Sequence, residues 1–317
     1  MARLPDRVAA ARSRRIRRDD PSYPPLLGVI DDAPPSLWVR GDASLLAATA
    51  VAVVGARHAT ALGLEMGERL GAGLAAAGIV VVSGCAIGID AAAHRGALDV
   101  GGATVAVLAG GLDVAVPPSN RSLASRIVRE GGCLAGEHAD GTPIAGRWAF
   151  PRRNRIIAGL ARVVVVVEAA ARSGALITAR LALGAGREVL VVPGHPLTEA
   201  YAGSNALLGD GARPVLDAGD VLAELAGLPR LDVARLPADR GDAARRDPPR
   251  DRAGLRARVH ASLGSEPRAP ESLALALGLP VGAVLGALTE LELVGLARVR
   301  PGQRFSLPRE PPRRDEG

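Results

Sequence analysis

Residues 150–180 read FPRRNRIIAGLARVVVVVEAAARSGALITAR, and this stretch decides the fold. An arginine-rich helix leads into a short, wholly apolar strand that ends at Glu168, and a Ser-Gly turn then opens a second helix. A strand without polar alternation between two helices is typical of a parallel sheet that is covered on both faces. The stretch therefore predicts an α/β protein.

The same alternation extends in both directions from this stretch. Short runs rich in Val, Ile and Ala alternate with amphipathic segments of helical character. The predicted strands are 51–55, 79–83, 103–108, 163–168 and 188–192. Right-handed crossovers between such strands give a Rossmann-like, doubly wound and mainly parallel sheet.

Composition divides the chain into four predicted parts. Residues 1–20 are predicted to be a disordered or weakly helical N-terminal segment, and residues 21–228 to form the Rossmann-like domain with a proline-rich, strand-bearing N-terminal extension. A charged, proline-bearing linker without periodicity follows at 229–253. Residues 254–317 read as three helices and a hairpin around Pro301-Gly302, which describes a small C-terminal winged-helix domain.

The overall composition is that of an ordinary soluble protein. Of the 317 residues, 48% are hydrophobic and 23% are charged, which suffices for a buried core. No apolar run approaches the roughly 18–20 residues of a membrane span, and the amino terminus lacks the apolar stretch of a signal peptide. We therefore expect a cytoplasmic protein with no membrane partner.

The sequence carries no metal or cofactor signature. Cys85 and Cys133 are the only cysteines and form neither a CxxC motif nor a Cys/His ligand spacing, while the five histidines are scattered. The glycines of GCAIG at 84–88 have the wrong spacing for a dinucleotide fingerprint, and there is no GxxxxGK[ST] motif. We expect no structural metal and no cofactor.

Positive charge is concentrated in one segment of the main domain. The chain carries a formal charge of +6 and has no lysine, but residues 45–228 hold fifteen arginines and fifteen acidic residues. Residues 147–155 contain no acid; their arginines are Arg147, Arg152, Arg153 and Arg155, and their aromatic residues are Trp148 and Phe150. Guanidinium groups hold phosphates through paired N–H donors, and aromatic faces stack on bases. The alternative is a solvated basic loop whose aromatic residues pack on the core.

Small residues follow every predicted strand. The turns are Gly55-Ala56-Arg57, Ser83-Gly84, Ala109-Gly110-Gly111, Ser173-Gly174 and Pro193-Gly194. The carboxyl ends of parallel strands meet at one edge, where glycines let a phosphate approach main-chain N–H groups and helix amino termini add a favourable dipole. The pattern predicts a phosphate-binding rim.

Four carboxylates could border this rim: Asp90, Asp113, Glu137 and Glu168. As general acids, general bases or metal ligands they would indicate a hydrolase. Helix capping and turn-holding are commoner roles for such residues, and no nucleophile has a base at a recognisable spacing. We expect no catalytic residues.

The charges of the C-terminal domain favour a protein partner over DNA. Winged helices often place the second helix of the motif in the major groove. Here that helix reads PVGAVLGALTELELVGL, with Glu290 and Glu292 and no arginine. A helix of this charge is repelled by phosphates.

Several segments together resemble the DprA (Smf) family of DNA-processing proteins. They are VAVVGARHAT at 51–60, VVVSGCAIGIDAAAHRGAL at 80–98, AVLAGGLDVAVPPSNRSLASRI at 106–127, FPRRNRIIAGLARVVVVVEAAARSGALITARLAL at 150–183 and REVLVVPG at 187–194. FPRRNRIIAGL together with SGALITA is very specific. The tail is similar to the winged-helix domain of many members, whereas the helical domain that often precedes the sheet is missing or reduced to residues 1–20.

The resemblance implies a non-catalytic protein that binds single-stranded DNA cooperatively as a homodimer. It also implies protection of incoming strands during natural transformation and loading of the RecA recombinase. By motif position, the implied phosphate-gripping residues are Arg57, Ser83, Gly84, Phe150, Arg153, Asn154 and Arg155. Gly55, Ser173 and Gly174 join this DNA site through the rim, and Arg147 and Arg152 through charge alone. Ile87 stands where some relatives have a basic residue.

An enzyme is the alternative from another class. A Rossmann-like nucleoside-monophosphate hydrolase would hold a phosphate on the glycine rim and use Glu168 or Glu137 to cleave a glycosidic bond. The FPRRNR stretch favours a polymer over a small nucleotide, and LAGGLDV runs into PPSN instead of the expected Gly-Gly-x-Gly-Thr turn. A scaffold that contacts RecA or the uptake machinery without binding DNA is disfavoured by the arginine cluster.

Overall fold

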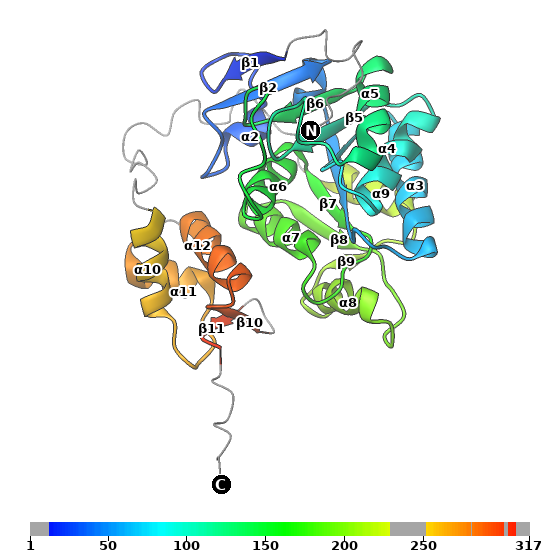
Figure 1. Cartoon of the computed structure of the whole chain (residues 1–317). Coiled ribbons are helices and arrows are strands. Elements are labelled where there is room, and N and C mark those ends of the chain that lie inside the picture. Colours follow the sequence, from blue (N-terminus) through cyan, green and yellow to red (C-terminus); the bar gives the residue numbers. More distant parts are fainter. Residues whose placement is uncertain (1–12, 229–251, 280, 301–303, 309–317) are drawn as a thin grey trace. The chain divides into compact units, whose positions relative to one another are not determined.

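The computed structural model describes residues 13–228, 252–279, 281–300 and 304–308. The chain divides into two compact units, Met1–Ala238 and Asp239–Gly317. Figure 1 shows a large sheet flanked by helices in the first unit, and helices with a small hairpin in the second.

The first unit is built on a nine-stranded sheet of order β1-β2-β6-β5-β4-β3-β7-β8-β9. Its strands are β1 (Arg14–Arg17), β2 (Ser36–Gly41), β3 (Ala50–Val54), β4 (Val80–Ser83), β5 (Thr104–Leu108), β6 (Cys133–Gly136), β7 (Val163–Val166), β8 (Glu188–Val191) and β9 (Arg213–Pro214). The strands from β3 to β9 pair in parallel with one another, and the β1–β2 and β2–β6 pairs are antiparallel. The predicted Rossmann-like, mainly parallel sheet is confirmed.

The strand order reverses at β3. The chain adds β4, β5 and β6 on one side of β3 and then returns to its other side with β7, β8 and β9. β3 and β7 pair in register from Val51 opposite Val163 to Val54 opposite Val166. In open α/β sheets, ligands bind outside the carboxyl ends of the strands at such a reversal.

Two helical layers cover the sheet because its central strands are apolar on both faces. One layer is α3 (Ala61–Ala76), α4 (Ile89–Asp99), α5 (Arg121–Arg129) and α9 (Ala218–Gly227); the other is α2 (Pro25–Gly28), α6 (Ala149–Leu160), α7 (Gly174–Gly184) and α8 (Ala202–Gly209) (Figure 1). Alternate residues of β3 separate the two cores. Ala52 and Val54 pack on the α6 and α7 side, while Val51 and Val53 pack on the α3 and α4 side.

The five predicted strands correspond to β3, β4, β5, β7 and β8. Strand β6 was not predicted, because it has only four residues, CLAG, and ends in glycine. The proline-rich segment does contain a strand, β2, as expected.

The prediction for the amino terminus is wrong where the structure describes it. Residues 1–12 lie outside the described part of the chain, but Arg14–Arg17 form the edge strand β1. Ile16 is buried and pairs with Leu37 of β2, while the arginines around it are exposed. A strand with a single buried side chain leaves too weak a pattern for sequence reasoning.

The second unit is a small winged helix, as predicted. It contains α10 (Arg252–Ser262), α11 (Pro270–Leu277), α12 (Val281–Leu293) and the antiparallel pair β10 (Arg298–Arg300) and β11 (Arg304–Ser306). Phe305 and Leu288 are fully buried in its core. The expected hairpin turn at Pro301-Gly302 lies outside the described residues, as does most of the predicted linker at 229–253, whose last two residues belong to α10.

No helix within the described ranges combines the length and the apolar character needed to cross a bilayer.

Candidate nucleic-acid interface

Two loops meet at the reversal of the sheet. The loop after β3 begins with Gly55, and the main-chain N–H of Ala56 donates to the carbonyl oxygen of Glu168, just beyond β7, at 2.7 Å. This bond joins the ends of the two central strands. Arg57, the next residue, is exposed.

Arg57 lies on an aromatic ring that comes from a distant part of the sequence. Its guanidinium carbon is 4.8 Å from the ring centroid of Phe150, which is partly exposed in the first turn of α6. A guanidinium at this distance is attracted by the face of the ring. The fold therefore brings together two of the predicted DNA-binding residues, one cationic and one aromatic.

Glu168 fixes the loop that carries Arg57. Its buried carboxylate accepts the main-chain N–H of Thr60 at 3.1 Å and the Thr60 hydroxyl at 2.6 Å. Thr60 in turn caps α3 by accepting from the N–H of Gly63 at 3.0 Å. The Tyr201 hydroxyl lies 3.5 Å from the Thr60 oxygen, and burial raises the pKa of Tyr201. The Glu168 carboxylate is therefore a hydrogen-bond acceptor for the loop after β3.

The loop after β4 packs against Ala56, the residue before Arg57. Cys85 has a φ of 53°, and Gly88 has a φ of 85°. A side chain on Gly88 would collide with the carbonyl oxygen of Ala56, and the N–H of Ile89 donates to that oxygen at 3.1 Å. Only glycine permits this close approach of the two loops.

Asp90 shapes the loop from inside. Its buried carboxylate accepts the N–H groups of Gly84 at 3.1 Å and Ala86 at 3.4 Å. Burial raises the pKa of Asp90, and the nearby Arg153 and these N–H donors oppose that rise. The sequence suggested that Asp90 caps the helix that follows; instead its carboxylate holds the loop ahead of α4, whose N-cap position is Gly88 and has no side-chain capping bond.

Arg153 is an internal residue. It is 7% exposed, and its guanidinium donates to the carbonyl oxygen of Gly84 at 2.6 Å, to the carbonyl oxygen of Val107 and to Asn154 Oδ1 at 3.1 Å. Burial lowers the pKa of Arg153. The expectation that Arg153 grips a phosphate directly disagrees with this arrangement, because the side chain is buried and its Nε and Nη1 donate to the protein itself.

The other residues of the RNR segment are also turned inward. Arg155 is buried and makes ion pairs of 2.9 Å with Asp32 and with Glu137. Asn154 is buried and donates to the carbonyl oxygen of Gly174 at 3.4 Å. Neither offers an accessible group to a phosphate, because both side chains are buried where α6 packs against the rest of the unit.

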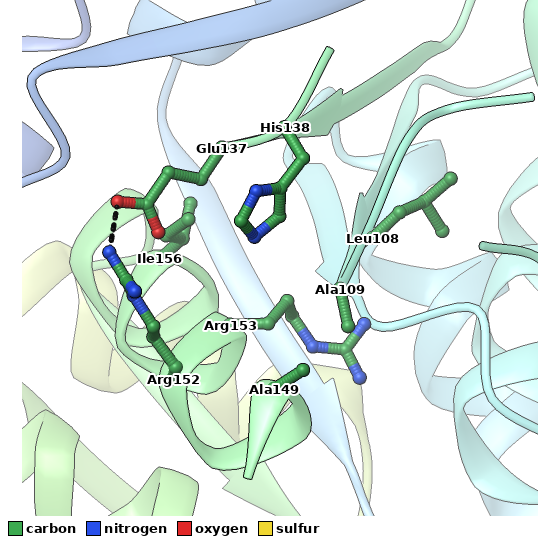
Figure 2. A pocket seen from close by; sticks show the side chains of 8 residues that line it. All are labelled: Leu108, Ala109, Glu137, His138, Ala149, Arg152, Arg153 and Ile156. Atoms are coloured by element: carbon green, nitrogen blue, oxygen red, sulfur yellow. Dashed lines mark hydrogen bonds and ion pairs between the residues drawn. The ribbon is translucent and has the colours of Figure 1, made fainter. Parts of the chain in front are cut away.

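A small pocket separates α6 from the loop after β6. It is lined by Leu108, Ala109, Glu137, His138, Ala149, Arg152, Arg153 and Ile156 (Figure 2). Glu137 pairs with Arg152 at 2.9 Å, and the His138 ring projects toward the space between Glu137 and Arg153 (Figure 2). Arg152 is thus partly exposed but already neutralised by an acid.

Two further predicted residues, Ser83 and Gly84, are buried. The Ser83 hydroxyl donates to the carbonyl oxygen of Val53 at 2.7 Å, and the N–H of Gly84 is taken by Asp90. In contrast, Gly174 is exposed at the start of α7, where Ser173 caps the helix by accepting from the N–H of Ala175 at 3.3 Å. Arg147 is exposed ahead of α6.

The predicted set therefore divides in two. The residues that are exposed or partly exposed at the carboxyl edge are Gly55, Arg57, Arg147, Phe150, Arg152, Ser173 and Gly174. The residues that lie buried beneath it are Ser83, Gly84, Arg153, Asn154 and Arg155. The sequence did not predict three contacts of these residues. Thr60 donates to Glu168, the Tyr201 hydroxyl lies beside that of Thr60, and Asp32 forms an ion pair with Arg155. Thr60 precedes an amphipathic helix, which is an N-cap signal; Asp32 gave none.

His94 is a fully buried residue of α4. Thr104 Oγ1 donates to the carbonyl oxygen of Val81 at 2.7 Å, so it must accept from His94 Nδ1, which lies 2.7 Å away. Nδ1 of the ring therefore carries a proton. Burial, with Arg153 and Arg95 nearby, lowers the pKa of His94 to about 3.

Comparisons with known proteins cover both folded units. Residues 14–226 match the family model described as DNA recombination-mediator protein A, and residues 243–303 match the DprA winged helix domain. Protein Smf from Synechocystis sp. is 36% identical over 313 residues, which is 90% of this chain and 78% of the relative.

Two solved structures share the fold of the first unit. The X-ray structure of DNA processing protein A (DprA) from Streptococcus pneumoniae has a TM-score of 0.63 at 42% identity, over 67% of this chain and 74% of that chain. A structure that concerns the single-stranded DNA binding mode of DNA processing protein A from Helicobacter pylori has a TM-score of 0.58 at 29% identity, over 64% of this chain and 92% of that chain. With the sheet, the winged helix and most of the sequence matched, this chain belongs to the DNA recombination-mediator protein A family, whose members are named DprA or Smf.

Proposed function

We propose that this protein binds single-stranded DNA, without preference for sequence, along the carboxyl edge of its sheet. The observation that carries the proposal is the Arg57–Phe150 pair, in which an exposed guanidinium lies 4.8 Å from an aromatic ring where the strand order reverses. Arginine holds a phosphate of any nucleotide, and an aromatic face accepts any base. Neither contact reads sequence.

The exposed residues supply the contacts in this proposal. Arg57 and Arg147 bind phosphates, Phe150 stacks on a base, and Gly55 and Gly174 let the strand approach the main chain. Ser83, Gly84, Arg153, Asn154 and Arg155 hold this surface in shape from below. The division follows from their hydrogen bonds and ion pairs within the protein.

The family relation supports the same function. The Helicobacter pylori relative is described by its single-stranded DNA binding mode. On this basis we propose that the chain acts in the cytoplasm as a homodimer without a catalytic step, protects incoming strands in natural transformation and loads RecA. We also propose that 229–253 is a linker between the sheet domain at 21–228 and the winged helix at 254–317.

The hydrolase alternative has little support from the carboxylates it requires. Glu168 is buried and accepts two hydrogen bonds from Thr60, and Glu137 is paired with Arg152 and Arg155. Such groups act as structural acceptors. A general acid or base needs access to a substrate proton.

The test is a salt series of fluorescence anisotropy with a labelled single-stranded oligonucleotide and the matching duplex. We expect single-strand binding whose log–log salt slope is about −0.7 per phosphate contact. Arg57→Ala and Arg147→Ala should each weaken binding on every sequence and flatten the slope by about 0.7. Arg129→Ala, which removes an exposed arginine at the end of α5, is the matched control and should change neither quantity. Unchanged binding in both site variants would place the interface elsewhere.

A further inference from the structure

Trp148 is an exposed aromatic residue at the edge of the proposed DNA surface. All six aromatic residues of the chain lie in the described part, and Trp148 is the only one of them in the exposed class, at 51%. Tryptophan offers a large apolar surface, which proteins usually bury or use in recognition. This exposure calls for a partner.

The fold gives the Trp148 side chain no structural task. It occupies the N-cap position of α6 but makes no capping hydrogen bond. Within the described part of the chain its indole N–H has no hydrogen-bond partner, and its neighbour across the turn is Gly146, which has no side chain to cover it. Replacing the ring should therefore leave α6 intact.

The surroundings of Trp148 fit a nucleobase. Arg147 beside it is exposed, and residues 147–155 contain no acid that would repel a phosphate. Trp148 precedes Phe150 by two positions, so the two rings point to different sides of the first turn of α6. A strand that places one base on Phe150 can continue past the Arg147 guanidinium to Trp148.

We propose that Trp148 is a second base-stacking subsite, which extends the DNA surface beyond the Arg57–Phe150 pair. The ligand is a nucleobase of the same single strand, of any identity. The inference rests on the proposed function, because it assumes that the strand follows the carboxyl edge of the sheet. It adds a contact without charge, which should affect affinity but leave its salt dependence unchanged.

The first experiment uses Trp148 as its own reporter. Trp38→Phe leaves Trp148 as the single tryptophan of the chain. Stacking of a base quenches indole emission, so titration with oligo(dT) should quench the emission of this variant, with the same midpoint as anisotropy. Anisotropy that reports binding while the emission stays constant overturns the subsite but leaves the proposed function standing. Absence of any binding overturns both.

The second experiment measures the contribution of the ring. Trp148→Ala should weaken binding of oligo(dT) about 5- to 150-fold, which is the equivalent of one stacked base, with the salt slope unchanged. Trp148→Phe should retain most of the affinity. Val100→Ala is the matched control, because Val100 is an exposed apolar residue at the end of α4, at the opposite edge of the sheet. Unaltered affinity of Trp148→Ala, with a changed mass in analytical ultracentrifugation, would assign the ring to contact between copies instead.

Discussion

The guanidinium of Arg153 donates to the carbonyl oxygen of Gly84 at 2.6 Å, which fastens α6 to the carboxyl end of β4. A side chain on Gly84 would place its first carbon 2.5 Å from the Arg153 Nη2. The same guanidinium also donates to Val107 at the end of β5. This contact therefore requires both the absence of a side chain at Gly84 and the guanidinium of Arg153.

This contact is one of a series that connects Arg153 to Arg57 and leads back to α6. Arg153 holds the loop after β4, and that loop holds Ala56 through the N–H of Ile89. Arg57, which follows Ala56, lies over Phe150, and Phe150 shares α6 with Arg153. A buried residue can therefore position an exposed one without touching DNA.

Arg153→Lys distinguishes positioning of Arg57 by Arg153 from direct contact between Arg153 and DNA. A single ammonium cannot occupy the positions of both Nη1, which donates to Gly84 and Val107, and Nε, which donates to Asn154, and an unsatisfied buried acceptor costs about 1–3 kcal/mol. We expect a lower midpoint in urea unfolding and weaker DNA binding, with the salt slope of the folded protein unchanged. Arg57→Ala should show the opposite pattern, with a flatter slope and near-normal stability. A slope in Arg153→Lys that flattens as in Arg57→Ala would show that Arg153 contacts phosphate after all.

Arg57 and Phe150 should depend on one another. Phe150→Leu removes the ring that Arg57 lies on, and the cation–π contact at an exposed site is worth about 0.5–1 kcal/mol. It also removes the base stack, worth about 1–3 kcal/mol in DNA affinity. We expect the double variant Arg57→Ala/Phe150→Leu to lose less affinity than the sum of the two single losses. Additive losses in a double-mutant cycle measured by anisotropy would mean that the two residues act separately.

Much of the fold could be predicted from the sequence because its signals are local. The five central strands are apolar runs between helices, and each of the small turns follows a strand. The pairing of Arg155 with Asp32 had no such signal, because the two residues are far apart in the sequence and the acid lies in a proline-rich loop.

The roles of the arginines could be predicted less well than their positions. Arginine is rarely buried, so a cluster of four is first interpreted as a surface patch. In the structure only Arg147 of the four is fully exposed, since the partners of the others come from β4, β5, the loop after β6 and the N-terminal segment. Gly84 was the available clue, because it marks the place where a side chain from elsewhere approaches the main chain.

Glu168→Gln tests the structural reading of the buried carboxylate. The amide keeps the shape of the side chain but weakens its hydrogen bonds with Thr60, so we expect a loss of about 1–3 kcal/mol in the free energy of unfolding. DNA binding should weaken modestly, because Arg57 lies on the loop that Glu168 holds. Release of free base from nucleoside monophosphates, present in the wild type and abolished in this variant, would instead favour the hydrolase.

His94 makes stability depend on pH. Burial, with Arg153 and Arg95 nearby, lowers the pKa of folded His94 to about 3, while the unfolded chain has its ordinary value of about 6.5. Below about pH 6.5 His94 therefore binds a proton in the unfolded chain but not in the folded protein. The free energy of unfolding then falls by up to about 1.4 kcal/mol for each pH unit. The loss should continue toward pH 3 and be absent above pH 7. Asp90, whose pKa burial raises, acts in the opposite direction, so the comparison must be made with a variant of His94 itself.

His94→Gln keeps a donor for Thr104 but cannot titrate. Urea unfolding between pH 7.5 and pH 5 should show a steeper loss of stability in the wild type than in this variant. His58→Gln, which changes an exposed histidine, is the control and should follow the wild type. Parallel pH profiles for the wild type and His94→Gln would mean that His94 takes up a proton in the folded state, contrary to its lowered pKa.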